Sequence, residues 1–202
     1  DAEDPEEYVK DEEGNITIFN IGEKLKKGQR VSQYMNYQLL YEMSNWEQDV
    51  DKMLPALAAL GNMYKKVHYD PDGEAVSSEL KFPNQVIINN NAKSIDNCII
   101  TEIIELLPHE IVSRIRGDIF SKFDYDFEER TNSKLHTFLE QYTWLDLDDD
   151  DYPEPYIITT HQQSNKVVRI IPRFVKKDVS YNKKKEVKKI KAQEYWVHFG
   201  FI

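Results

Sequence analysis

The side chains best suited to chemistry are the histidines and the single cysteine, and their spacing fits no familiar catalytic or metal site. A zinc site needs several Cys or His ligands at short, regular intervals, but no His-x₃-His pair and no second cysteine are present. Cys98 lies among isoleucines, where a thiol behaves as a small apolar group and not as an activated nucleophile. We interpret each histidine as a surface or satisfied core residue: His68, His109, His136, His161 and His198.

A second candidate is the aspartate-rich run that begins at Asp146. Carboxylate oxygens are the preferred ligands of Ca²⁺ and Mg²⁺, but a calcium loop alternates its ligands and contains a glycine for its sharp turn. Here the aspartates are contiguous and no glycine follows. We interpret the run as a solvated acidic loop, with a weak cation site or a basic-partner site as the alternative. The residues that would bind a basic partner are Asp148, Asp149, Asp150 and Asp151.

Other enzyme signatures are missing from the sequence. The seven glycines form no phosphate-binding loop, and there is no GxSxG or HExxH motif. Four carboxylates could flank a substrate as glycosidase acids do, although a polar junction between helices explains them more simply: Asp124, Asp126, Glu128 and Glu129. We expect no enzymatic activity, no metal, no cofactor and no small-molecule substrate; a hydrolase with a carboxylate site is the least favoured alternative.

Charge is distributed very unevenly along a chain whose formal net charge is -10. Asp1 to Glu13 contains eight acids and one lysine, and Asp146 to Glu154 contains six acids and no base. Lys166 to Lys191 contains eleven bases, with only Asp178 and Glu186 as acids. Such a pattern is typical of a basic contact segment on an acidic body.

The basic segment is the one feature whose functional interpretation is as strong as the structural one. Clustered lysines with neighbouring aromatic residues can bind phosphates by counterion release and stack on bases. The alternative is a solvated surface, or an arm that neutralises the chain's own acidic loops. The residues expected to contact RNA or an acidic surface are Arg169, Arg173, Lys176, Lys177, Lys183, Lys184, Lys185 and Lys188.

Length and composition predict a mostly folded chain. The 202 residues are 40% hydrophobic and 12% aromatic, which is enough to build a core. No apolar run approaches the roughly 20 residues that a membrane-spanning helix needs. The first residue is Asp1, which fits removal of a presequence. We expect an intracellular location, but the sequence does not decide the compartment. The alternatives are organellar (mitochondrial) and nuclear.

The first half of the chain is predicted to be an acidic flexible leader followed by helices. The leader covers residues 1–15, and residues 16–91 form a helical region with short strands. Ile16 to Ile21 alternates as a strand does. From Val31 to Leu60, apolar residues recur at steps of three and four, which predicts consecutive amphipathic helices. Two breaks are expected: one at Ser44 and Glu47, which have the form of a capping box, and one at Pro55.

The second half is predicted to contain three helices between Ser94 and Tyr142, the middle one opened by Pro108. Two β-branched runs then predict a hairpin, from Tyr156 to His161 and from Lys166 to Val175. We expect a lysine-rich helix from Lys183 to Gln193 and a final strand that returns to the core.

Three helices followed by a hairpin resemble a winged-helix domain of the kind found in RNA-associated and ribonucleoprotein assemblies. The resemblance covers residues 92–175 and implies contacts through the hairpin and the tail of residues 176–202. It completes the expected fold class: α+β, mainly helical, with a helical N-terminal part, a winged-helix-like part and a basic C-terminal arm.

We therefore expect a non-catalytic accessory or structural subunit of a larger ribonucleoprotein or protein assembly. Its partners would be other protein subunits and RNA, reached through the basic segment. The alternative is a protein-binding adaptor that places its acidic leader and aspartate-rich loop on a basic partner.

Overall fold

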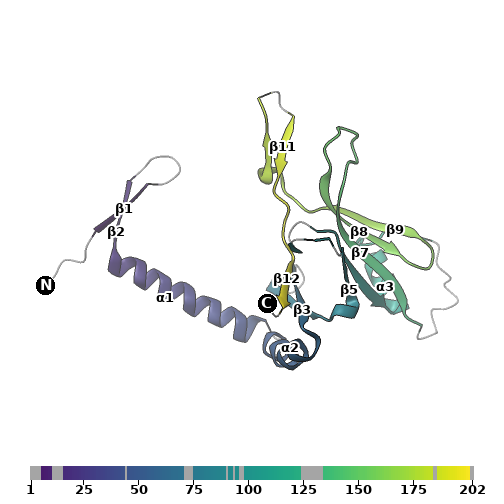
Figure 1. Cartoon of the computed structure of the whole chain (residues 1–202), viewed down its shortest axis with the longest axis horizontal. Helices are drawn as coiled ribbons and strands as arrows, with labels where there is room; N and C mark the ends of the chain where they lie inside the picture. Colours follow the sequence, from purple (N-terminus) through teal and green to yellow (C-terminus); the bar gives the residue numbers. More distant parts are fainter. Residues whose placement is uncertain are drawn as a thin grey trace. The chain divides into compact units, whose positions relative to one another are not determined.

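The computed structural model describes residues 6–10, 16–43, 45–70, 75–89, 91–92, 94–95, 98–123, 134–183 and 186–200. The chain forms two compact units (Figure 1). The first comprises Asp1–Lys52 and His68–Glu79, and the second comprises Met53–Val67 and Leu80–Ile202. No helix among the described residues is long and apolar enough to cross a membrane.

The first unit begins with a hairpin and continues into a long helix. Strands β1 (Glu6–Lys10) and β2 (Ile16–Asn20) pair antiparallel, which confirms the strand expected from Ile16. It also shows that the leader has regular structure at Glu6–Lys10, whereas the rest of the leader lies outside the described residues. Helix α1 (Ile21–Tyr37) follows directly and ends in a π-helical turn, η1 (Gln38–Glu42).

Helix α2 (Trp46–Leu60) continues through Pro55, so the interruption expected there is wrong. The helical run does break after η1, where the Met43 N–H bonds to the Gln38 carbonyl, and α2 begins at Trp46. This agrees with the break expected at Ser44 and Glu47, although Ser44 itself lies outside the described residues. Gly61 ends α2 with a φ of 79° and donates its N–H to the Leu57 carbonyl, 2.9 Å away. Glycine adopts this left-handed conformation without steric cost, which explains the stop.

The second unit is built on a five-stranded antiparallel sheet in the order β5-β6-β7-β8-β9. Helix α3 (Pro108–Arg116) lies between β6 and β7 in the chain. It places Ile111 in the core. The five strands are β5 (Val86–Ile88), β6 (Ile100–Leu106), β7 (His136–Leu145), β8 (Glu154–His161) and β9 (Lys166–Pro172).

Two smaller sheets complete the described structure. One has the order β12-β3-β4, and the other pairs β10 with β11 (Figure 1). Short 3₁₀ turns, η2 (Pro83–Gln85) and η5 (Lys176–Asp178), precede β5 and β10. The remaining strands are β3 (Asn62–Asp70), β4 (Ala75–Lys81), β10 (Val179–Tyr181), β11 (Val187–Ile190) and β12 (Trp196–Gly200).

The core of the second unit consists of two apolar clusters. The first gathers residues of β3, β5, β6, β7, β8 and β12, and the second gathers residues around α3. Strand β7 contributes to both, through Tyr142 and Phe138. Between these two residues lies Glu140, which is also buried. A polar band therefore separates two apolar clusters on one face of the sheet.

The expectation of a mainly helical fold is wrong, because the structure is 33% helix and 39% strand. The helix expected after Ser94 is strand β6, and the one expected after Ser133 is strand β7. Only the middle helix of the expected three exists, as α3, with Pro108 in its first turn as predicted. In the described residues, two strands therefore stand where the resemblance to a winged-helix domain placed its first and third helices.

Buried polar residues explain the two misassigned helices. In β7 the inward-facing residues are His136, Phe138, Glu140 and Tyr142, spaced by two. Because two of these are polar, the hydrophobic alternation that identifies a strand is broken, and the remaining apolar residues match helical spacing by chance. Glu102 interrupts β6 in the same way.

In the C-terminal part, the strands predicted from the sequence are confirmed, but the predicted helix is not. Strands β8 and β9 form the predicted hairpin, with β9 at the sheet edge. Strand β12 is the predicted final strand, and its Trp196 joins the core. The lysine-rich helix is wrong: Val187–Ile190 forms β11 instead. In this strand the β-branched Val187 and Ile190 are half-buried, whereas Lys188 and Lys189 are exposed.

Candidate functional site

A row of polar side chains crosses the five-stranded sheet. Each residue faces the next across a pair of neighbouring strands. Three of the four are buried, so two carboxylates share a site of low dielectric constant, where they repel each other unless they are neutralised. The row consists of Glu102 on β6, Glu140 on β7, Thr159 on β8 and Arg169 on β9.

Lys66 of β3 neutralises both carboxylates. Its Nζ lies 2.7 Å from Glu102 Oε2 and 2.8 Å from Glu140 Oε1. Lys81 of β4 adds a contact of 2.6 Å to Glu102 Oε1, and Arg169 lies 3.8 Å from Glu140 Oε2. Every carboxylate oxygen in the row therefore has a cationic neighbour.

The pKa shifts of Lys66 and Glu140 favour the charged form of both side chains. Burial alone would lower the pKa of Lys66, but attraction to Glu140 and Glu102, with hydrogen bonds to both, raises it above its ordinary value. Burial alone would raise the pKa of Glu140, but Lys66 lowers it. Because Lys66 and Glu140 stabilise each other in their charged forms, we assign the network a structural role.

The two arginines expected to contact an anion both contact other residues of the second unit, and Arg169 is partly exposed whereas Arg173 is buried. Arg169 lies in the polar row, and Arg173 is only 3% exposed. The Arg173 guanidinium stacks on Trp144, 4.9 Å from the ring centre, and on Tyr142, at 5.8 Å. Its Nε and Nη2 have no hydrogen-bond partner among the described residues. Neither arginine lies on the basic surface where the sequence had placed it.

The lysines are presented differently, because they lie on the small β10–β11 sheet and its flanks. Among the described residues, none of the lysines in this group forms an ion pair. All are exposed. The group, named here the lysine hairpin, comprises Lys176, Lys177, Lys183, Lys188, Lys189 and Lys191. Lys184 and Lys185 lie outside the described residues.

Local hydrogen bonds shape the lysine hairpin. The Asn182 N–H donates to the Glu186 carbonyl, and the Glu186 N–H donates to Asn182 Oδ1, 3.0 Å away. Val179 pairs with Ile190, and Ser180 pairs with Lys189. These side chains alternate between faces, so the hairpin carries apolar residues on one face and Lys189 on the other. Tyr181 at its end is 61% exposed.

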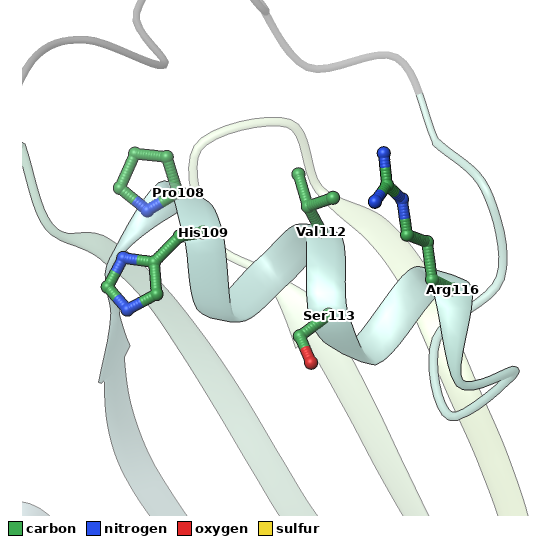
Figure 2. A pocket seen from close by; sticks show the side chains of 5 residues that line it. All are labelled: Pro108, His109, Val112, Ser113 and Arg116. Carbon is green, nitrogen blue, oxygen red and sulfur yellow. The ribbon is translucent and has the colours of Figure 1, made fainter.

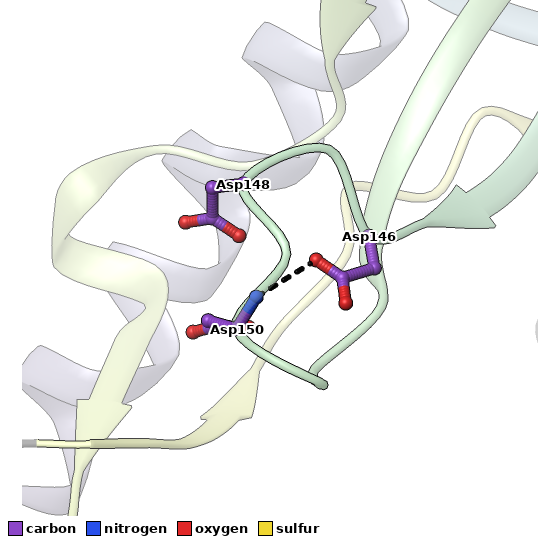
Figure 3. Close-up of side chains that lie close together, drawn as sticks. All are labelled: Asp146, Asp148 and Asp150. Carbon is purple, nitrogen blue, oxygen red and sulfur yellow. Dashed lines mark hydrogen bonds between the residues drawn. The ribbon is translucent and has the colours of Figure 1, made fainter.

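The acidic loop lies beside the base of the lysine hairpin. The Tyr152 hydroxyl accepts a hydrogen bond from the Ile190 N–H, 3.3 Å away. Asp146 organises the loop by accepting a bond from the backbone N–H of Asp150 (Figure 3) and another from the backbone N–H of Asp151. The predicted basic-partner residues, Asp148 to Asp151, are all exposed.

The carboxylates of Asp146, Asp148 and Asp150 lie close enough for one cation, with ligand atoms within 4.8 Å of one another. Backbone hydrogen bonds to Asp146 account for this arrangement without an ion. The sequence-based interpretation as a solvated loop therefore fits the geometry. The other acidic set, Asp124 to Glu129, lies outside the described residues.

Two histidines that looked scattered in the sequence are in contact in the fold. His136 Nδ1 lies 3.2 Å from His161 Nε2, and His161 Nδ1 lies 2.8 Å from Ser164 Oγ. Both rings are buried, and Phe138 packs on His161. Burial lowers the pKa of His161, with a further contribution from His136. Pairing of β7 with β8 creates this contact, which only the correct register could have revealed.

A surface cavity of about 470 Å³ lies along α3 (Figure 2). Its described lining consists of one helix face, with Pro108, His109, Val112, Ser113 and Arg116. The three polar members of this lining are exposed. They project from one helix turn after another and do not converge on a common point, so we assign the cavity no reaction.

Sequence reasoning missed the polar row entirely. The available signal was a glutamate inside each of two segments rich in β-branched and aromatic residues, around Glu102 and Glu140. A buried carboxylate of that kind requires a basic partner from another strand. Lys66 and Lys81 could not be chosen from the sequence, because their strands are distant along the chain.

Comparison with protein-family models and with curated protein sequences finds no match for this chain.

Replacing Lys66 tests its structural role. Lys66→Met leaves two buried carboxylates with less compensation, and removing one partner of such a network costs about 3–5 kcal/mol. We expect urea-induced unfolding to show a loss of that size. The double variant Lys66→Met/Glu140→Gln should recover part of it, because one stranded charge is gone. Equal stability of Lys66→Met and the unchanged protein would contradict this role.

The histidine contact predicts a pH-dependent stability. Because the folded-state pKa of His161 lies below its ordinary value, the unfolded chain binds this proton first. Its stabilising contribution is complete above pH about 6.5 and is lost as the pH falls below that value. Urea midpoints measured between pH 8 and 5 should decline, and His161→Gln should reduce the decline. The matched control is His109→Gln, on the exposed face of α3; an equal reduction in both variants would contradict the assignment.

Proposed function

We propose that this chain is a non-catalytic subunit of a larger ribonucleoprotein assembly and that its lysine hairpin contacts RNA phosphates. The observation that carries the proposal is the concentration of exposed lysines, without ion pairs among the described residues, on one short hairpin. Phosphate contacts of this kind derive their free energy from released counterions and need no deep pocket.

Local geometry supports an RNA partner over self-neutralisation. The acidic loop adjoins the hairpin through Tyr152 and Ile190. Yet no ion pair joins the lysine hairpin to Asp146, Asp148, Asp149, Asp150 or Asp151 in the described part of the chain. The positive charge is therefore available to an external anion, and the exposed Tyr181 ring offers a stacking surface for an unpaired base.

The polar row and Arg173 support the non-catalytic part of the proposal. The buried carboxylates Glu102 and Glu140 are paired with cations, and Arg173 is buried. The contacts instead hold β3, β7 and the start of the arm in place. On this proposal the second unit is a scaffold that presents the hairpin.

A second candidate function is that of an adaptor for a basic protein. It is supported by the exposure of Asp148 to Asp151, which places four carboxylates on one loop. Pull-down of partners after nuclease treatment separates the two functions. Partners lost with nuclease favour the RNA contact, whereas partners that persist and depend on these aspartates favour the adaptor.

The RNA contact predicts a specific salt dependence. We expect binding of a single-stranded RNA, followed by fluorescence anisotropy, to weaken steeply between 50 and 200 mM salt. In the variant Lys183→Gln/Lys188→Gln/Lys189→Gln, the slope of log K against log salt should decrease by up to about 0.7 per lysine that contacts a phosphate.

The matched control replaces three exposed lysines outside the basic segment: Lys26→Gln, Lys52→Gln and Lys122→Gln. It changes the net charge by the same amount but leaves the hairpin intact, so we expect a nearly unchanged slope. Equal effects of the two triple variants would mean that overall charge, and not the hairpin, governs binding. RNA affinity that is indifferent to salt would refute the phosphate contact.

A further inference from the structure

The Arg173 guanidinium is a buried cation without a counterion among the described residues. The residue is only 3% exposed. It forms no ion pair in the described part of the chain, in contrast to Lys66 and Lys81, which contact carboxylates. Burial lowers the pKa of Arg173, because the attraction of nearby groups does not offset the loss of water. A charge in this position requires an anion beside it.

The unpartnered atoms of Arg173 form one anion-binding edge. Its Nε and Nη2 are both buried, and neither has a hydrogen-bond partner among the described residues. In a guanidinium group the N–H bonds of these two atoms lie side by side and point in the same direction. They therefore match the two oxygens of one carboxylate. Two unrelated donors would indicate imperfect packing, whereas these two donors form a complete binding edge.

Aromatic side chains hold this edge in place. The Arg173 Cζ atom lies 4.9 Å from the ring centre of Trp144 and 5.8 Å from that of Tyr142. Contact with ring faces orients a guanidinium and leaves its edges for hydrogen bonds. The same aromatic cluster contains a further buried donor without a partner, Trp196 Nε1. The Trp196 and Tyr142 ring centres are 5.6 Å apart. Around Tyr142, the described residues therefore include more N–H donors than acceptors to pair with them.

We infer that Arg173 binds the carboxylate of a small monocarboxylate ligand. One carboxylate brings two acceptor oxygens for Nε and Nη2 and one negative charge for one positive charge. A doubly charged phosphate would leave a negative charge unpaired in a site of low dielectric constant, which disfavours it. Because neighbouring groups cover both donor atoms, RNA or a folded protein partner cannot reach them. The sequence alone does not predict this ligand, because the unpaired state of Arg173 depends on the fold.

Entry of the ligand requires a neighbouring side chain to move, and Tyr195 is well placed to do so. Its ring lies 5.8 Å from the ring of Tyr142, and it is close enough to Arg173 to influence the pKa of the guanidinium. The side chain is half-buried, and its hydroxyl donates to Gln193 Oε1, 2.8 Å away. A side chain held by such a local bond can rotate outward while the sheet stays in place.

Intrinsic fluorescence provides the test, because Trp144 and Trp196 both lie in this aromatic cluster. The full chain is titrated with acetate at constant ionic strength, with chloride as the balancing anion. We expect a saturable change in tryptophan fluorescence and a higher urea midpoint in acetate, since a ligand that binds only the folded state stabilises it. Inorganic phosphate should bind more weakly than acetate.

The variant Arg173→Lys keeps the positive charge but loses the paired N–H bonds. Its acetate affinity should fall at least about tenfold. Circular dichroism checks its fold, and the titration of the unchanged chain does not depend on any variant. The control Lys183→Gln/Lys188→Gln/Lys189→Gln should bind acetate as the unchanged chain does, because it alters only the lysine hairpin. This inference is therefore independent of the RNA contact.

The variant Glu194→Gln tests whether a carboxylate of the chain itself is the counterion. Glu194 is exposed and acts electrostatically on Arg173 without forming an ion pair. Its replacement should leave the urea midpoint unchanged, and a lower midpoint would assign the site to Glu194. Identical fluorescence and midpoints in acetate and chloride would overturn the inference. So would full acetate affinity in Arg173→Lys, or tighter binding of phosphate than of acetate.

Discussion

The second unit depends on one interaction, the bridge that Lys66 makes between Glu102 and Glu140. These carboxylates face each other on adjacent central strands, with an apolar cluster on each side. Without a cation at this point, repulsion and desolvation would oppose pairing of β6 with β7. Because Lys66 belongs to β3, the same contact that stabilises the five-stranded sheet also fixes where β3 lies against it. Register and tertiary position are thus specified together by three side chains.

Local signals in the sequence were sufficient where each element could be recognised without its partner. The β8–β9 hairpin, α3 behind Pro108 and the final strand all follow from short patterns, because β-branched runs and a first-turn proline act locally. Strands β6 and β7 could not be recognised in this way. Their buried glutamates and His136 are stable only because Lys66, Lys81 and His161, on other strands, contact them. The local spacing of residues does not indicate these contacts.

The candidate binding surface was predictable in position but not in form. The position of the dense group of lysines after Val175 was evident from charge alone. Which of the basic residues of this region are exposed and which contact the sheet was not. Arg173 and Arg169 have the same formal charge as the lysines, but their planar guanidinium groups stack or pair readily when desolvated. Arg173 is buried, and the partly exposed Arg169 lies 3.8 Å from Glu140. The lysines of the lysine hairpin are exposed. In this part of the chain, the two arginines therefore contact the sheet, whereas the lysines extend beyond it.

The anchoring of Arg173 also defines where the arm begins and ends. The backbone N–H of Arg173 donates to the Pro155 carbonyl. The backbone carbonyl of Arg173 accepts a bond from the Gln193 N–H, 2.8 Å away. The chain thus leaves the sheet and returns to it at one point, and residues 174–192 form a closed excursion. Insertions, deletions and charge changes within such an excursion leave the sheet and the final strand in place. Evolution could retune what this protein binds while leaving untouched the fold that presents the binding surface.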